Sequence, residues 1–185
     1  MLRRLAQIAV MCLLAGHGLA AEQAGGRPDV APQTAATQLQ PYRSHLGRFR
    51  VDFPAGKPQH SVIAITLKGG ASSMLHQTWV KPAHGNAAYM VMYNDYPADY
   101  VSQAAEDVLA AARSGAVEGK TVLCDRPISL EGVPGRAFTA TDRGGWHYVV
   151  RQFLAGQRLY QLIVVSDKAQ PEADAEAFLG SFRIR

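Results

Sequence analysis

Between Phe49 and Val165 the chain alternates apolar and polar residues in eight short runs, separated midway by one long stretch of helical period. Alternation with a period of two is typical of strands that bury one face. Turns rich in Gly and Pro separate most of the runs, which favours hairpins and therefore a mainly antiparallel sheet. The eight runs are residues 49–53, 60–68, 73–81, 87–94, 120–130, 134–141, 146–154 and 158–165. The last run is apolar on both faces, which predicts a central strand.

Two segments have the spacing of helices. In the first, Pro97 suits the first turn and Gly115 suits the position just past the end. The second helix is expected over residues 171–181. The apolar residues of the first segment recur every three or four positions: Val101, Ala104, Ala105, Val108, Leu109 and Ala112. This order of elements, four strands, a helix, four strands and a helix, predicts an α+β domain with a sheet of seven to eight strands covered by two helices.

The first forty residues differ from this pattern. Residues 1–20 combine Arg3 and Arg4 with a short apolar run and small residues before Ala21, which indicates a cleaved secretory signal peptide. An uncleaved membrane anchor is the alternative. Residues 21–41 are rich in Ala, Gln, Gly and Pro, which predicts a flexible linker. We therefore expect a single domain over residues 42–185, with no transmembrane segment after signal cleavage.

The signal and the Ala-rich composition suggest a bacterial protein that is periplasmic or secreted. Removing Arg3 and Arg4 lowers the formal net charge from +4 to about +2, which is too small to argue for a nucleic acid partner. Basic residues do concentrate at the two ends of the domain, where a solvated face is the simplest interpretation: Arg43, Arg48, Arg50, Arg183 and Arg185. Cys124 is the one cysteine left after signal cleavage, and its strand-like surroundings predict a buried free thiol rather than an intermolecular disulfide or a reactive nucleophile.

Three short segments resemble PsbP-like domains. These are the run from Phe49 to Pro54, the run from Arg158 to Leu162, and the run from Phe178 to Phe182 after an acidic, Ala-rich helix. PsbP-like domains occur in photosystem extrinsic subunits, in a nuclear-import factor and in secreted bacterial lipoproteins. The resemblance covers residues 45–183 and lacks the lipid-attachment cysteine of the lipoproteins. It implies an antiparallel sheet between helices and a role in binding or assisting, and it carries no catalytic residue with it.

The stretch SGAVEGKT, residues 114–121, looks like the end of a nucleotide-binding phosphate loop. That loop needs a glycine at position 114, which is Ser114 here. The order of elements is also reversed, because a helix ends and a strand begins at this point, so phosphate would meet the carboxyl end of a helix. The sequence therefore predicts no nucleotide site, and no motif indicates any other cofactor.

Residues for metal binding or catalysis are sparse. The histidines after the signal have no metal-ligand spacing, although His76 and His84 flank one turn, so no metal site is expected: His45, His60, His76, His84 and His147. The best candidate acid–base pair is Asp142 with His147. A two-residue turn at Gly144–Gly145 would place them opposite each other on a hairpin. A local charge pair is the simpler interpretation.

An aromatic set is the best candidate for binding, because Tyr and Trp combine a large apolar surface with a polar tip. Core packing is the alternative. The candidates are Tyr93, Tyr96, Tyr100, Trp79 and Trp146. The leading hypothesis is a non-enzymatic accessory or binding protein with a protein partner or small ligand in the cell envelope. The alternatives are a small hydrolase or metal-dependent enzyme that uses Asp142 and His147, and a structural envelope component.

Overall fold

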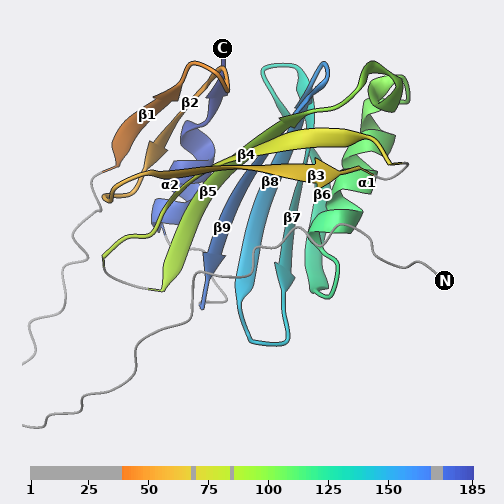
Figure 1. Ribbon diagram of the computed structural model, residues 1–185. Coiled ribbons are helices and arrows are strands. Elements are labelled where there is room, and N and C mark those ends of the chain that lie inside the picture. Colours follow the sequence, from red (N-terminus) through yellow and green to blue (C-terminus); the bar gives the residue numbers. More distant parts are fainter. Residues whose placement is uncertain (1–38, 68–69, 84–85, 168–172) are drawn as a thin grey trace, which may run out of the picture.

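The computed structural model describes residues 39–67, 70–83, 86–167 and 173–185 (Figure 1). The predicted signal peptide, most of the predicted linker and His84 lie outside these ranges. Seven antiparallel strands form the large sheet, in the order β3-β4-β5-β9-β8-β7-β6. Their bounds are β3 (Gln59–Thr66), β4 (Ser72–Val80), β5 (Ala87–Asp95), β6 (Thr121–Leu130), β7 (Val133–Thr141), β8 (His147–Ala155) and β9 (Arg158–Ser166). The predicted α+β fold with a large antiparallel sheet and two helices is confirmed.

The two halves of the chain meet at the centre of this sheet. Strands β3 to β5 form one meander and strands β6 to β9 form the other, and β5 pairs with β9 along its whole length. Strand β9 is buried on both faces between Leu159 and Val165, so the prediction of a central strand is correct. In Figure 1, β3 and β4 run across the front of the other strands, and the two helices lie at opposite sides of the sheet.

The first helical segment is interrupted. A 3-10 helix, η1 (Ala98–Val101), comes first, and the α-helix α1 (Ala105–Ala116) begins only after Ala104 adopts an extended conformation. The expected single helix from Pro97 is therefore wrong. Gly115 lies inside α1 rather than past its end, and the chain reverses at Gly119, whose φ is +75°. A positive φ costs little only for glycine, so Gly119 makes the turn into β6.

A second, three-stranded sheet was not foreseen. It has the order β1-β2-β10 and joins β1 (Gln40–Ser44), β2 (Phe49–Phe53) and β10 (Arg183–Ile184). Strand β1 begins two residues before the expected domain start at Tyr42. The run 49–53, which was expected among the strands of the main sheet, belongs to this small sheet instead. The pairing of β2 with β10 brings the two ends of the domain together (Figure 1).

The small sheet and α2 (Ala173–Ser181) cover one face of the large sheet, here called the α2 face. Phe53 and Tyr89 pack on Phe178 of α2, with ring centroids 5.2 Å and 5.4 Å away. The opposite face, here called the α1 face, is covered by α1 through Val108 and Leu109. The core therefore has two layers, one on each side of the sheet.

Strand β6 forms one edge of the large sheet, and it is exposed along much of its length. Cys124 is exposed there, so the prediction of a buried thiol is wrong. The reason is a bulge: Val122 pairs with Ala140 and Cys124 pairs with Thr139, which leaves Leu123 as an extra residue. A bulge shifts the alternation of side chains by one position, so Val122 and Cys124 no longer share a face.

Candidate binding pocket

An open pocket lies where the small sheet meets one end of the large sheet. Its volume is about 480 Å³. The pocket forms between the β1–β2 turn, the end of β5, the β8–β9 turn and the last residues of β10. It is lined by Arg48, Asp95, Ala155, Gln157, Arg158, Tyr160, Ile184 and Arg185.

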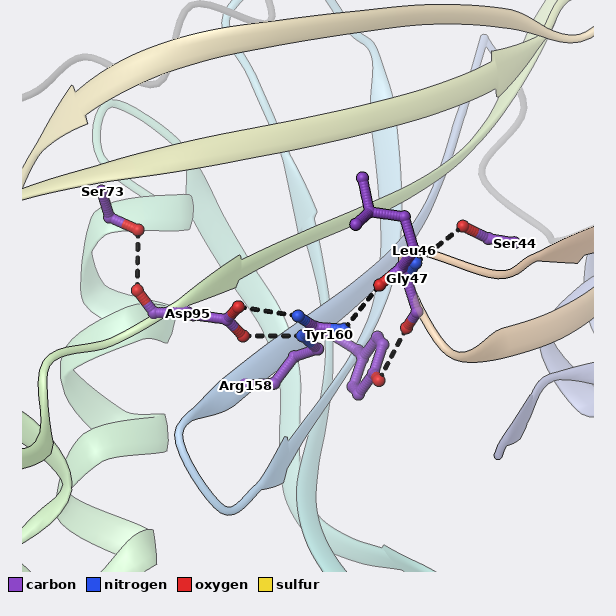
Figure 2. Close-up of polar contacts among 7 residues, drawn as sticks. All are labelled: Ser44, Leu46, Gly47, Ser73, Asp95, Arg158 and Tyr160. Atoms are coloured by element: carbon purple, nitrogen blue, oxygen red, sulfur yellow. Dashed lines mark hydrogen bonds and ion pairs between the residues drawn. The ribbon is translucent and has the colours of Figure 1, made fainter.

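Arg158 is the most extensively bound side chain of the pocket (Figure 2). Its Nε and Nη2 donate hydrogen bonds to the two carboxylate oxygens of Asp95, at 2.6 and 2.7 Å. Its Nη1 donates to the carbonyl oxygen of Leu46 in the β1–β2 turn, at 2.9 Å. A two-pronged contact of this kind fixes the plane of the guanidinium group as well as its position. Arg158 therefore joins the small sheet to the large one.

The stacked rings of Tyr93 and His76 lie beside Arg158. The guanidinium carbon lies 4.9 Å from the centre of the Tyr93 ring, a cation–π contact. The imidazole of His76 is parallel to the same ring, with centroids 4.6 Å apart. Burial raises the pKa of Tyr93, so its hydroxyl stays protonated at neutral pH.

The β1–β2 turn is held by contacts at Gly47. The Gly47 amide donates to Oγ of Ser44 at 2.9 Å, and the Tyr160 hydroxyl donates to the Gly47 carbonyl at 2.8 Å (Figure 2). A Cβ at position 47 would lie 2.6 Å from the Phe49 ring, so glycine is needed for this close approach. The next residue, Arg48, has a φ of +51°, an uncommon conformation for a residue with a side chain. These constraints bring Arg48 to the pocket wall.

The pocket carries a net positive charge. Asp95 is its one acidic residue among the lining side chains, and both of its oxygens accept from Arg158. The hydrogen bonds from Arg158 hold the pKa of the Asp95 carboxyl below its usual value. No carboxylate of the described residues lies within ion-pair distance of the Arg48 or Arg185 side chains. Two guanidinium groups of the pocket are therefore available to an anionic group.

Replacement of Asp95 by Asn is expected to reduce the acid sensitivity of the fold. A carboxyl whose pKa is lowered by folding stabilises the protein above its unfolded-state pKa, and this stabilisation is lost as the pH falls through the folded-state pKa. Because the Asp95 side chain is 56% exposed, we expect a cost of about 1 kcal/mol or less at pH 7. Urea unfolding at pH 7 and pH 2.5 tests this: the difference in stability between wild type and Asp95→Asn should be smaller at the lower pH. An equal difference at both values would contradict it.

The five predicted aromatic residues are dispersed over several clusters. Tyr93 belongs to the core of the α2 face, and its ring contacts Arg158 of the pocket. The Tyr96 amide donates to the carbonyl of Gln157, which lines the pocket, at 2.8 Å. Tyr96 and Tyr100 stack at 5.8 Å beside α1, and burial raises the pKa of Tyr96 to about 12. Their role in binding stays a prediction: the Tyr93 ring touches the pocket residue Arg158, and Tyr96 adjoins the pocket through its backbone.

The two tryptophans are half-buried elsewhere in the fold. Trp146 packs against the cluster around Phe138 on the α1 face. Trp79 lies near the end of β4, where its register partner in β5 is Met90. Neither lines the pocket.

The expected register of Asp142 and His147 is wrong. His147 pairs with Thr141, because the connection between β7 and β8 has five residues rather than two at its tip. The Asp142 carboxylate instead accepts from the amides of Gly144 and Trp146 and from the Tyr148 hydroxyl, at 2.8, 3.1 and 2.8 Å. Through these hydrogen bonds, the Asp142 carboxylate stabilises the turn between β7 and β8. The acid–base role proposed for the pair has no geometric support here.

The described histidines do not converge with other metal-binding side chains. Within the described ranges, no group of three or more His, Cys, Asp or Glu side chains converges on one point. No helix in the same ranges is long and apolar enough to cross a membrane.

The pocket itself was not predicted. In the sequence, Arg48 and Arg185 are basic residues near the two ends of the domain, and Arg158 begins both a strand and one of the segments that resemble PsbP-like domains. The one useful signal in the sequence is the concentration of arginines at both ends of the domain. These arginines form a site only if the two ends lie side by side in the fold. The β2–β10 pairing supplies this condition.

Comparison with known proteins finds similarity in the fold. The solution structure of cyanobacterial PsbP from Synechocystis sp. PCC 6803 matches with 13% sequence identity and a TM-score of 0.49, over 85% of this chain and 98% of that chain. The chain resembles PsbP at the level of the fold. The predicted resemblance to PsbP-like domains is confirmed at that level, and nothing about function is taken from it. No protein-family model matches the chain, and no curated protein matches its sequence.

Proposed function

We propose that this chain is an exported, non-enzymatic binding protein whose pocket takes a carboxylate or phosphate group of a small ligand. Export rests on the pattern of residues 1–20. The observation that carries the binding proposal is the convergence of Arg48, Arg158 and Arg185 on one open pocket. Guanidinium groups bind carboxylates and phosphates through paired hydrogen bonds, so this lining suits an anionic group.

The arrangement of the three arginines supports selective binding. Arg158 is fixed by Asp95, Leu46 and Tyr93, which gives the pocket a rigid wall. Arg48 and Arg185 have no carboxylate partner of their own in the described part of the chain, and their contact to each other is between backbones, at 2.8 Å. A bound anion would relieve the repulsion between neighbouring positive charges.

The chemistry of the lining favours binding over catalysis. The two side chains that could transfer a proton are already engaged: Asp95 accepts from Arg158, and the Tyr160 hydroxyl donates to Gly47. Burial also raises the pKa of Tyr160, which disfavours ionisation. A ligand in the pocket would therefore meet fixed hydrogen-bond donors and no activated nucleophile.

Thermal unfolding in the presence of simple anions tests this proposal. Inorganic phosphate and succinate, compared with chloride at equal ionic strength, should raise the Tm of the wild type by a few °C near saturation, since a ligand that binds only the folded state stabilises it. The double variant Arg48→Gln/Arg185→Gln should lose most of this rise. Arg126→Gln/Arg143→Gln, which removes two exposed charges elsewhere, should keep it. An equal rise in both variants, or none in the wild type, would rule out the proposal.

A further inference from the structure

Three arginines lie side by side on the small sheet. Arg50 in the central strand β2 is the register partner of both Arg43 in β1 and Arg183 in β10. Neighbouring strands are about 4.8 Å apart, so the three side chains leave the sheet within about 10 Å of one another. Here these residues are called the arginine row. Phe49 and Val51 alternate with Arg50 and face the core, so the row points to the outside.

The arginine row lowers the stability of the folded protein. Like charges directly opposite each other on neighbouring strands destabilise a sheet. Arg183 lies 3.5 Å from Glu131, and Asp52 lies on the same outward face as Arg50, two residues further along β2. Arg43 and Arg50 are exposed and make no ion pair with any described residue. An external anionic partner is the simplest reason for such a row.

The turn between β1 and β2, at one end of the arginine row's hairpin, carries an exposed apolar side chain. Leu46 is 69% exposed, the largest exposed fraction of any large apolar residue in the described ranges. It lies at the tip of the hairpin that carries Arg43 and Arg50, between His45 and Arg48. Figure 1 shows this turn projecting at one end of the molecule, next to the C-terminal strand. Apolar side chains next to basic residues are the combination that interfacial membrane-binding segments use, the apolar part entering the headgroup–acyl boundary and the basic part attracting anionic lipids.

We propose that the arginine row and Leu46 dock this protein on the surface of a bilayer that contains anionic phospholipids. The row binds headgroup phosphates, which repeat across a bilayer surface and neutralise adjacent guanidinium groups together. Leu46 enters the boundary between headgroups and acyl chains. An acidic protein fits less well, because the core of a protein interface is apolar and aromatic, whereas this surface has one exposed leucine beside a row of charges.

Co-sedimentation of residues 21–185, the chain expected after signal cleavage, with lipid vesicles tests this inference. Vesicles of phosphatidylcholine alone are compared with vesicles that also contain phosphatidylglycerol. Each basic residue near an anionic surface contributes about a fivefold gain in binding, so Arg43→Gln/Arg50→Gln should bind phosphatidylglycerol vesicles about 30-fold more weakly than the wild type. The control Arg126→Gln/Arg143→Gln has the same net charge and should lose less than about threefold. Omitting residues 1–20 removes an apolar segment that would bind vesicles independently of this surface.

A second variant tests the apolar part of the surface. Leu46→Ser should weaken binding about tenfold, and its loss should persist at high salt, because burial of an apolar side chain is not screened by ions. Equal losses in the two arginine double variants would overturn the inference, as would equal binding of the wild type to both kinds of vesicle. Binding to soluble polyaspartate without binding to phosphatidylglycerol vesicles would assign the row to an acidic protein instead. The variant Arg43→Gln/Arg50→Gln should retain the thermal response to phosphate, which separates this surface from the pocket.

Discussion

Phe178→Ala is expected to lower the free energy of unfolding by about 3–5 kcal/mol, the range for loss of a fully buried aromatic ring. Phe178 lies on α2 with no exposed surface, between Phe53 of the small sheet and Tyr89 of the large sheet. Truncation would leave a cavity that three different elements line. Well-packed surroundings of this kind relax only in part after truncation, so a cavity would remain.

Urea unfolding monitored by circular dichroism measures this effect. Phe178→Leu retains most of the apolar volume and should cost no more than about 1.5 kcal/mol. Leu46→Ala, at an exposed position, should stay within about 0.5 kcal/mol of the wild type. A loss below about 1 kcal/mol for Phe178→Ala would show that α2 is not packed as described.

Gln161→Leu is the second change with a large expected effect, at about 1–3 kcal/mol of destabilisation. Gln152 and Gln161 face each other on the central strands β8 and β9 and are both buried on the α1 face. Nε2 of Gln152 donates to Oε1 of Gln161 at 2.9 Å. The substitution removes this acceptor and leaves a buried amide with no described partner, since Oε1 of Gln152 already has none.

The double variant Gln152→Leu/Gln161→Leu should recover most or all of the lost stability. Replacing both members of a buried hydrogen-bonded pair by apolar side chains leaves no group unsatisfied. A double-mutant cycle from urea unfolding of the four proteins gives the coupling between the two positions. A double variant less stable than Gln161→Leu would mean that the glutamine pair has contacts beyond those described.

Local patterns predicted the strands that pair with a neighbour close in the chain. The strands of the β6–β9 meander follow from alternation and turns, and the central place of β9 follows from its two apolar faces. The small sheet did not follow, because β10 has two residues and β1 contains Pro41, so neither has a recognisable pattern. The break before α1 was also missed, since the apolar spacing continues from Val101 through Ala105 across a non-helical segment.

The candidate site depends on contacts between distant residues, which is why the sequence did not reveal it. Asp95 and Arg158 are 63 positions apart and meet through the register of β5 with β9. The Leu46 carbonyl, which accepts a hydrogen bond from Arg158, is 112 positions away from it in the sequence. For Asp142 and His147, the sequence predicted a contact that the structure does not have. The prediction assumed a two-residue turn, whereas five residues connect β7 and β8.

The measurement closest to the central claim is a phosphate titration followed by NMR of the arginine Nε–H groups. The proposal predicts saturable shifts for Arg48, Arg158 and Arg185, with Arg43 and Arg126 unchanged once ionic strength is held constant. Loss of the Arg158 shift in Arg48→Gln/Arg185→Gln would place the anion in the pocket. Shifts of similar size at all arginines, or saturable shifts confined to residues outside the pocket, would contradict the claim.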